Sequence, residues 1–157
     1  MQALEDLAAR TSELNGIGCT FECHRPVAIA DDQTAMHLYR MSQEAVTNAV
    51  KHGRPRHIVI RLGVEGDRTT LRVIDDGTGF TALPENAREN SSGTGLRIMR
   101  YRADLIGAQL EISSARPQGT IVTCSVAQHP TPECDSLVVG DGQLLESGRL
   151  DPSRSCR

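Results

Sequence analysis

The sequence predicts a domain of α/β (α+β) class, and three observations lead to this prediction. Three stretches carry apolar residues at the spacing of an amphipathic helix. Shorter stretches, several of them β-branched, have the pattern of strands and lie between or after the helical ones. The 157 residues leave room for one domain with a core of its own, built mainly from aliphatic residues because aromatic residues are few.

Composition and charge argue against a nucleic-acid or membrane segment. The formal net charge is −3, and Lys and Arg are spread along the chain rather than gathered in a basic tract. No apolar run is long enough to span a bilayer, and the first ten residues lack the layout of a signal peptide. Five cysteines without paired spacing fit a reducing compartment. We therefore expect a cytoplasmic domain without direct membrane contact, in a parent protein that is either membrane-attached or soluble.

The N-terminal half predicts two helices separated by a strand. Residues 1–14 have helical spacing, and residues 19–23 alternate between apolar and polar as a strand does. The longest predicted helix runs to about His52, with Asp31 and Asp32 as candidate N-caps.

A hairpin, a second glycine-bounded helix and two further strands follow in the predicted order. Residues 57–62 and 69–74 form the hairpin around a turn at 65–67, and the later helix lies between Gly95 and Gly107. The last two strands cover residues 109–113 and 120–126.

Three residues on one face of the long predicted helix have the chemistry of a metal and phosphate site. Glu44, Asn48 and Lys51 lie at positions i, i+4 and i+7. The amide oxygen of Asn48 is a hard ligand suited to Mg²⁺, and Glu44 can orient or deprotonate a group beside the metal. The alternative is a solvated helix face, which the spacing alone does not exclude.

The strand that ends at Ile74 runs directly into an acidic, glycine-rich turn. Gly77 and Gly79 let the backbone pass close to a flat ligand, and the Asp75 carboxylate can accept a hydrogen bond from an exocyclic amine. The alternative is a simple hairpin turn, for which Asp-Gly is common. However, the following residues, 81–92, are polar and irregular, and they predict a mobile loop rather than a return strand.

A second glycine pair, Gly93 and Gly95, lies at the start of a predicted helix. Unpaired N–H groups and the positive end of the helix dipole make such a position suitable for an anion. The alternative is an ordinary helix start, because one Gly-x-Gly is weak evidence. The segment lacks the Gly-Lys-Ser/Thr ending of a P-loop.

In this order, the motifs resemble the GHKL (Bergerat-fold) ATPase superfamily, and within it the two-component sensor histidine kinases of the nitrate-sensor type. Residues 43–52 are similar to that family's N-box, Asp75 to Phe80 to its first glycine box, and residues 93–103 to its second glycine box and helix. Gly119-Thr120 is similar to the last ATP-site threonine of the family. The resemblance covers roughly residues 34 to 126.

The resemblance implies a fold, two cofactors and a set of roles. The fold is a two-layer sandwich, with a mixed, mostly antiparallel sheet and helices packed on one face. Asp75 would bind the adenine amine of ATP, Asn48 would hold Mg²⁺ and Glu44 would be the catalytic, polarising carboxylate, while residues 81–92 would close as a lid. The residues implied to contact the nucleotide are Asn48, Lys51, His52, Asp75, Gly77, Gly79, Phe80, Gly93, Thr94, Gly95, Leu96 and Thr120.

The resemblance also implies presentation of Mg-ATP to a histidine on a separate dimerisation domain, followed by transfer to a response regulator. Residues 1–15 would then be a helical stub of the dimerisation region, 16–126 the ATPase domain and 127–157 a disordered tail, which is rich in Gly, Ser, Asp and Pro. Two alternatives stay open: a stand-alone serine kinase of the anti-sigma type, and a nucleotide-binding regulatory module without transfer.

None of the five histidines has the acidic helical context of a phosphoacceptor. His52 is fixed on the helix that carries Asn48, and His24 and His57 are expected at strand ends away from the motifs. We therefore expect no histidine autophosphorylation by this chain alone.

Overall fold

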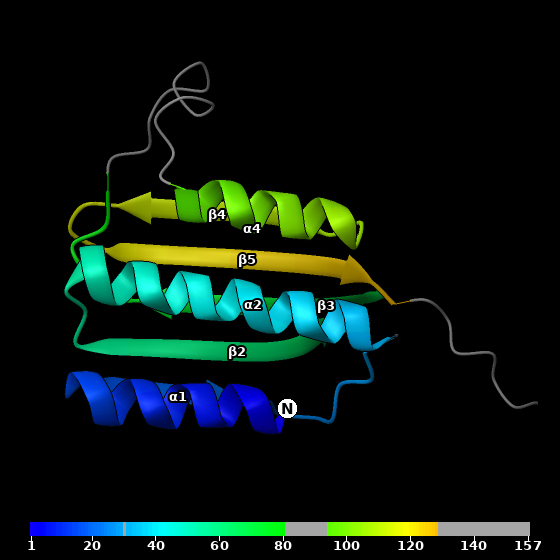
Figure 1. The fold of residues 1–157 in the computed structure, drawn as a ribbon, viewed down its shortest axis with the longest axis horizontal. Coiled ribbons are helices and arrows are strands. Elements are labelled where there is room, and N and C mark those ends of the chain that lie inside the picture. The colour runs from blue at the N-terminus through cyan, green and yellow to red at the C-terminus, as the bar shows by residue number, and fades with distance from the viewer. Residues whose placement is uncertain (30, 81–93, 129–157) are drawn as a thin grey trace, which may run out of the picture.

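In the computed structural model, which describes residues 1–29, 31–80 and 94–128, helices cover one face of a five-stranded sheet (Figure 1). The helices are α1 (Gln2–Asn15), α2 (Asp32–Asn48), the π-helix η1 (Ala49–Gly53) and α4 (Thr94–Leu105). The strands are β1 (Gly18–Glu22), β2 (His57–Glu65), β3 (Arg68–Asp75), β4 (Gln109–Ala115) and β5 (Gly119–Ala127). The predicted two-layer α/β sandwich is confirmed.

The sheet has the strand order β1-β2-β3-β5-β4, in which β1 and β2 are parallel and the other neighbours antiparallel. The central strand β3 ends at Asp75, which pairs with Ile58 near the start of β2 and with Thr120 near the start of β5. The C-terminal end of α2 and the start of α4 lie at this same end of the molecule, on the left in Figure 1. Residues far apart in the sequence therefore meet beside Asp75.

The helix layer packs on the sheet through aliphatic side chains. The most deeply buried of these include Leu38 and Met41 of α2, Ile60 of β2 and Met99 of α4, each at most 2% exposed. Burying a side chain of this kind stabilises a fold by about 1.5–3 kcal/mol. The core therefore holds α2 and α4 in fixed positions over the end of the sheet where the glycine-rich motifs lie.

The helical segment that starts with α2 begins and ends as predicted, but its last turn is a π-helix. The Asp31 carboxylate accepts the backbone N–H of Thr34 at 2.7 Å, as an N-cap does. After Asn48 the hydrogen bonding widens to the i→i+5 pattern of η1, which carries the helical segment to Gly53. Arg54 follows with φ 49°, in the left-handed region, and reverses the chain towards β2.

Helix α1 contributes to the same core. Leu4, Ala8 and Thr11 are buried, and the Ser12 hydroxyl accepts the backbone N–H of Cys19 at 2.8 Å and donates to the Cys19 carbonyl at 3.1 Å. These contacts attach α1 to β1. The assignment of residues 1–15 to a dimerisation region stays a prediction.

Two predicted segments fall largely beyond the structure's coverage. The predicted lid, 81–92, lies outside the described residues, as does most of the predicted tail, 127–157. Among the residues that the structure covers, no helix combines the length and the apolar composition needed to cross a membrane.

Candidate functional site

The carboxylate of Asp75 is buried at the end of the central strand, where its residue is 7% exposed. Its Oδ1 accepts the backbone N–H of Gly77 at 2.9 Å. Burial raises the pKa of Asp75, while hydrogen bonds from Gly77 and Thr120 oppose this rise. A buried carboxylate of this kind is a strong acceptor for a ligand N–H group.

Gly53 and Gly77 approach each other beside Asp75. The backbone N–H of Thr78 donates to the Gly53 carbonyl at 2.8 Å. A Cβ on Gly77 would lie 2.5 Å from that carbonyl oxygen and 2.8 Å from Asp75 Oδ1, so no side chain fits there. Glycine at both positions therefore lets the two backbone segments come into direct contact beside Asp75.

The turn after β3 is also attached to the hairpin between β4 and β5. The Ser114 hydroxyl accepts the backbone N–H of Phe80 at 2.9 Å, donates to the Gly119 carbonyl at 3.1 Å and lies 3.1 Å from Thr120 Oγ1. Gly119 has φ 84°, and a Cβ on it would overlap the Asp75 backbone carbonyl. The predicted residue Thr120 therefore does lie beside Asp75.

A second cluster forms where the start of α4 meets α2. Glu44 and Asn48 are both half-buried on α2. A Cβ on Gly95 would overlap Glu44 Oε1 and lie 3.0 Å from Asn48 Nδ2, so these three predicted residues are in one place. The positive end of the α4 dipole faces the Glu44 carboxylate, which stabilises negative charge at this position.

The other predicted residues lie around these two clusters. Lys51 and His52 are exposed on η1, which connects Asn48 to Gly53. The π-helical periodicity of η1 changes the angle between Lys51 and the Glu44–Asn48 face from the α-helical value, and the shared role of these three residues stays a prediction. Phe80 is 38% exposed, Thr94 is exposed, and Leu96 packs against the core. Gly79 has φ 60°, and a Cβ on it would lie 2.5 Å from the Ala115 carbonyl. Gly93 lies outside the described residues.

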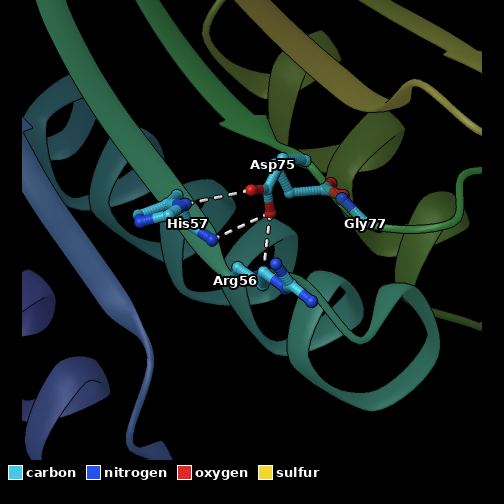
Figure 2. A network of polar contacts seen from close by, with 5 residues as sticks. Arg56, His57, Asp75 and Gly77 are labelled. Atoms are coloured by element: carbon cyan, nitrogen blue, oxygen red, sulfur yellow. Dashed lines mark hydrogen bonds and ion pairs between the residues drawn. The ribbon is translucent and has the colours of Figure 1, made fainter.

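His57 was expected away from the motifs, and that prediction was wrong. Its Nδ1 lies 3.0 Å from Asp76 Oδ2, and the backbone N–H groups of Arg56 and His57 donate to Asp76 Oδ1 at 2.7 and 2.8 Å (Figure 2). The antiparallel register brings the start of β2 beside the end of β3. Asp76, Gly53 and Ser114 were not predicted as site residues. Gly53 follows the N-box directly, whereas nothing in the sequence marks Ser114.

The glycine contacts at Asp75 and Glu44, on a helix-covered mixed sheet, define the class of this domain as a Bergerat-fold ATPase. A family model described as histidine kinase-, DNA gyrase B-, and HSP90-like ATPase matches residues 33–130, and the chain belongs to that family.

Two curated relatives are a histidine-protein kinase/phosphatase and a nitrate/nitrite sensor. The signal transduction histidine-protein kinase/phosphatase DegS of Bacillus subtilis is 31% identical over 122 residues, which cover 74% of this chain and 31% of DegS. The nitrate/nitrite sensor protein NarQ of Escherichia coli is 30% identical over 124 residues, which cover 78% of this chain and 21% of NarQ. The resemblance to nitrate sensors is therefore confirmed, and the chain spans less than a third of the length of either relative.

Solved structures agree on the fold. The ATP-binding domain of PrrB from Mycobacterium tuberculosis superimposes with a TM-score of 0.65 at 19% identity, covering 82% of this chain and 93% of that one. At this identity the likeness shows the fold alone.

Proposed function

We propose that this domain binds Mg-ATP between the end of β3 and the polar face of α2, and that it serves as the catalytic ATP-binding domain of a cytoplasmic sensor histidine kinase. In the whole protein, the bound nucleotide is presented to a histidine on a separate dimerisation domain, and the phosphoryl group then passes to a response regulator. Two relatives support this proposal by their names: DegS is a signal transduction histidine-protein kinase/phosphatase, and NarQ is a nitrate/nitrite sensor protein.

The observation that carries the proposal is the pairing of two unlike clusters through one short segment. Asp75 and Gly77 form an acceptor site at a strand end, whereas Glu44, Asn48 and Gly95 form a polar junction at a helix N-terminus. The η1 segment joins the two, because it runs from the residue after Asn48 to Gly53. A nucleotide likewise has two linked parts, a flat base and a phosphate chain that binds a metal ion. The first part would bind at Asp75 and the second at Glu44 and Asn48.

At the first cluster, the proposed ligand group is the adenine amine. The Asp75 carboxylate accepts its N–H, and Gly53 and Gly77 place no side chain against this carboxylate. A hydrogen bond between a buried carboxylate and a ligand N–H contributes roughly 1.5–3 kcal/mol. Discrimination against guanine follows, since its carbonyl at the same ring position would face a carboxylate.

At the second cluster, the donors fit Mg²⁺ and phosphate. The Asn48 amide supplies an oxygen ligand of the type Mg²⁺ takes, and Glu44 lies one turn away to polarise a neighbouring group. Bound Mg²⁺ would supply charge neutralisation on the phosphate oxygens. The chain's own contribution is to fix Asn48 and Glu44 against Gly95 and to offer exposed Lys51 and His52 for the phosphates.

The test is incubation of the chain with labelled ATP, Mg²⁺ and a helical-hairpin protein that carries an acceptor histidine. Acid-labile, base-stable label on the hairpin supports the proposal. Label on a serine of a partner protein would instead favour an anti-sigma-type kinase. Nucleotide binding without transfer to either acceptor would favour a regulatory module.

A further inference from the structure

The two adjacent carboxylates at the end of β3 have opposite surroundings. Asp75 is buried among the residues of the proposed adenine site, whereas the Asp76 side chain is 45% exposed and turned to the start of β2. Asp76 Oδ1 accepts the backbone N–H groups of Arg56 and His57, and Oδ2 lies 3.0 Å from His57 Nδ1 (Figure 2). Because both Asp76 oxygens already contact groups of the protein, this carboxylate has a structural role rather than a ligand-binding one.

The backbone of Asp76 is held at the same place. Its N–H donates to the His57 carbonyl at 3.2 Å, one position beyond the last pair of the β2–β3 ladder. Hydrogen bonds from His57 and Arg56 lower the pKa of Asp76, because they stabilise its ionised form.

Asp76 connects the two backbone segments that form the sides of the site beside Asp75. One side is Gly77, the next residue along the chain, whose N–H donates to Asp75 Oδ1. The other side is Gly53, three residues before Arg56. The two sides are already in close contact, since a Cβ on Gly77 would lie 2.5 Å from the Gly53 carbonyl. A shift of a few tenths of an ångström between them would therefore alter the site.

We propose that Asp76 is a positioning residue for adenine recognition: by binding the backbone N–H groups of Arg56 and His57, it fixes Gly53 and Gly77 around the Asp75 carboxylate. This inference rests on the proposed function, because it assigns Asp76 a role in the same site. A residue that only linked the ends of β2 and β3 would contribute to the stability of the fold. Its replacement would leave the nucleotide affinity of the folded protein unchanged.

Replacement of Asp76 by Ala and by Asn separates these two roles. Asp76→Ala removes all three contacts of the carboxylate, and ADP affinity should fall about tenfold in the folded protein. Asp76→Asn keeps an oxygen where both backbone N–H groups converge, and its new amide group can donate to neutral His57 Nδ1. Its ADP affinity should stay within about twofold of wild type.

Val126→Ala is the matched control for lost stability. Val126 is 8% exposed and pairs with Thr69 near the other end of β3, so its truncation lowers the melting temperature at a distance from the site. Affinities are measured by calorimetry with ADP at a temperature where circular dichroism shows every variant folded. Val126→Ala should bind ADP as wild type does.

The outcomes distinguish this inference from the proposed function. If Asp75→Asn binds ADP as tightly as wild type, the proposed adenine site itself is wrong. If Asp75→Asn loses affinity but Asp76→Ala does not, or if Asp76→Asn loses as much as Asp76→Ala, positioning by Asp76 is refuted.

If Asp76→Ala does not fold, Asp76→Glu replaces it, since it keeps the charge but displaces the oxygens. Its affinity should be lower than that of Asp76→Asn, and an equal or higher affinity would overturn the inference.

Discussion

Gly95 at the start of α4 lies so close to Glu44 of α2 that a Cβ on Gly95 would overlap the Glu44 carboxylate. The two residues are 51 positions apart in the chain. Because the overlapping atom is the end of a flexible side chain, an added methyl group would move the Glu44 carboxylate rather than the helix. The contact therefore sets where this carboxylate lies in the proposed phosphate site.

Gly95→Ala should leave the fold intact but displace Glu44. We expect ADP affinity to change by less than about threefold, which is under 1 kcal/mol, and phosphoryl transfer to a histidine acceptor to fall much more. Gly63→Ala is the control, since a Cβ there meets nothing within 4 Å. Transfer assays and thermal melts of both variants check this prediction, and unchanged transfer by Gly95→Ala would argue against a role for Glu44.

Asn48→Ala should weaken nucleotide binding mainly when Mg²⁺ is present. Asn48 lies beside Gly95 and offers an amide oxygen, a ligand type suited to Mg²⁺, whereas the proposed adenine contacts lie at Asp75. Calorimetry with ADP in Mg²⁺ and in EDTA checks this. Equal losses in the two buffers would mean that Asn48 has a structural role only.

Asp75→Asn should raise the melting temperature of the nucleotide-free protein at pH 7. Burial raises the pKa of Asp75 above its ordinary value of 3.8, so the ionised form is less favourable in the folded protein than in the unfolded chain. The penalty builds as pH rises from that ordinary value through the raised pKa of the folded state, and it is absent at lower pH. Thermal melts from pH 3 to pH 8 should therefore show the largest gain for Asp75→Asn at neutral pH. A lower melting temperature for the variant at pH 7 would contradict this.

Helix α1 should be required for stability. Leu4 is 7% exposed against the common core, and its truncation to Ala should lower the free energy of unfolding by about 2 kcal/mol or more. Leu14→Ala is the control, because Leu14 is 82% exposed and its truncation should change the free energy by less than about 0.5 kcal/mol. Urea unfolding measures both. Equal effects would mean that α1 is only loosely attached.

Features that depend on local chemistry were predictable from the sequence. The N-cap at Asp31 follows from a side-chain acceptor before a helical pattern, and the β2–β3 hairpin follows from two β-branched stretches around Gly66. The motifs around Asp75 and Gly95 could be assigned to the end of a strand and the start of a helix. Glycines next to an apolar stretch mark such ends in the sequence.

Features that depend on register or on hydrogen bonding over longer distances were not predictable. No residue pattern in the sequence predicts the change from α-helix to π-helix at Ala49. A continuous α-helix through Lys51 was therefore the expectation. The contact between His57 and Asp76 arises only once β2 and β3 are aligned, and Ser114 reaches Phe80 only through the β4–β5 hairpin. These residues support the site from neighbouring strands, beyond the reach of motif spacing.

The most direct test of the proposed site is calorimetric titration of the wild-type chain and of Asp75→Asn with ADP and ATP in the presence of Mg²⁺. The wild-type chain should bind both nucleotides. The folded Asp75→Asn variant should bind them roughly ten- to a hundredfold more weakly, because the buried carboxylate that accepts the adenine N–H is gone. Equal affinity of the two proteins, or no binding by the folded wild-type chain, would contradict the account.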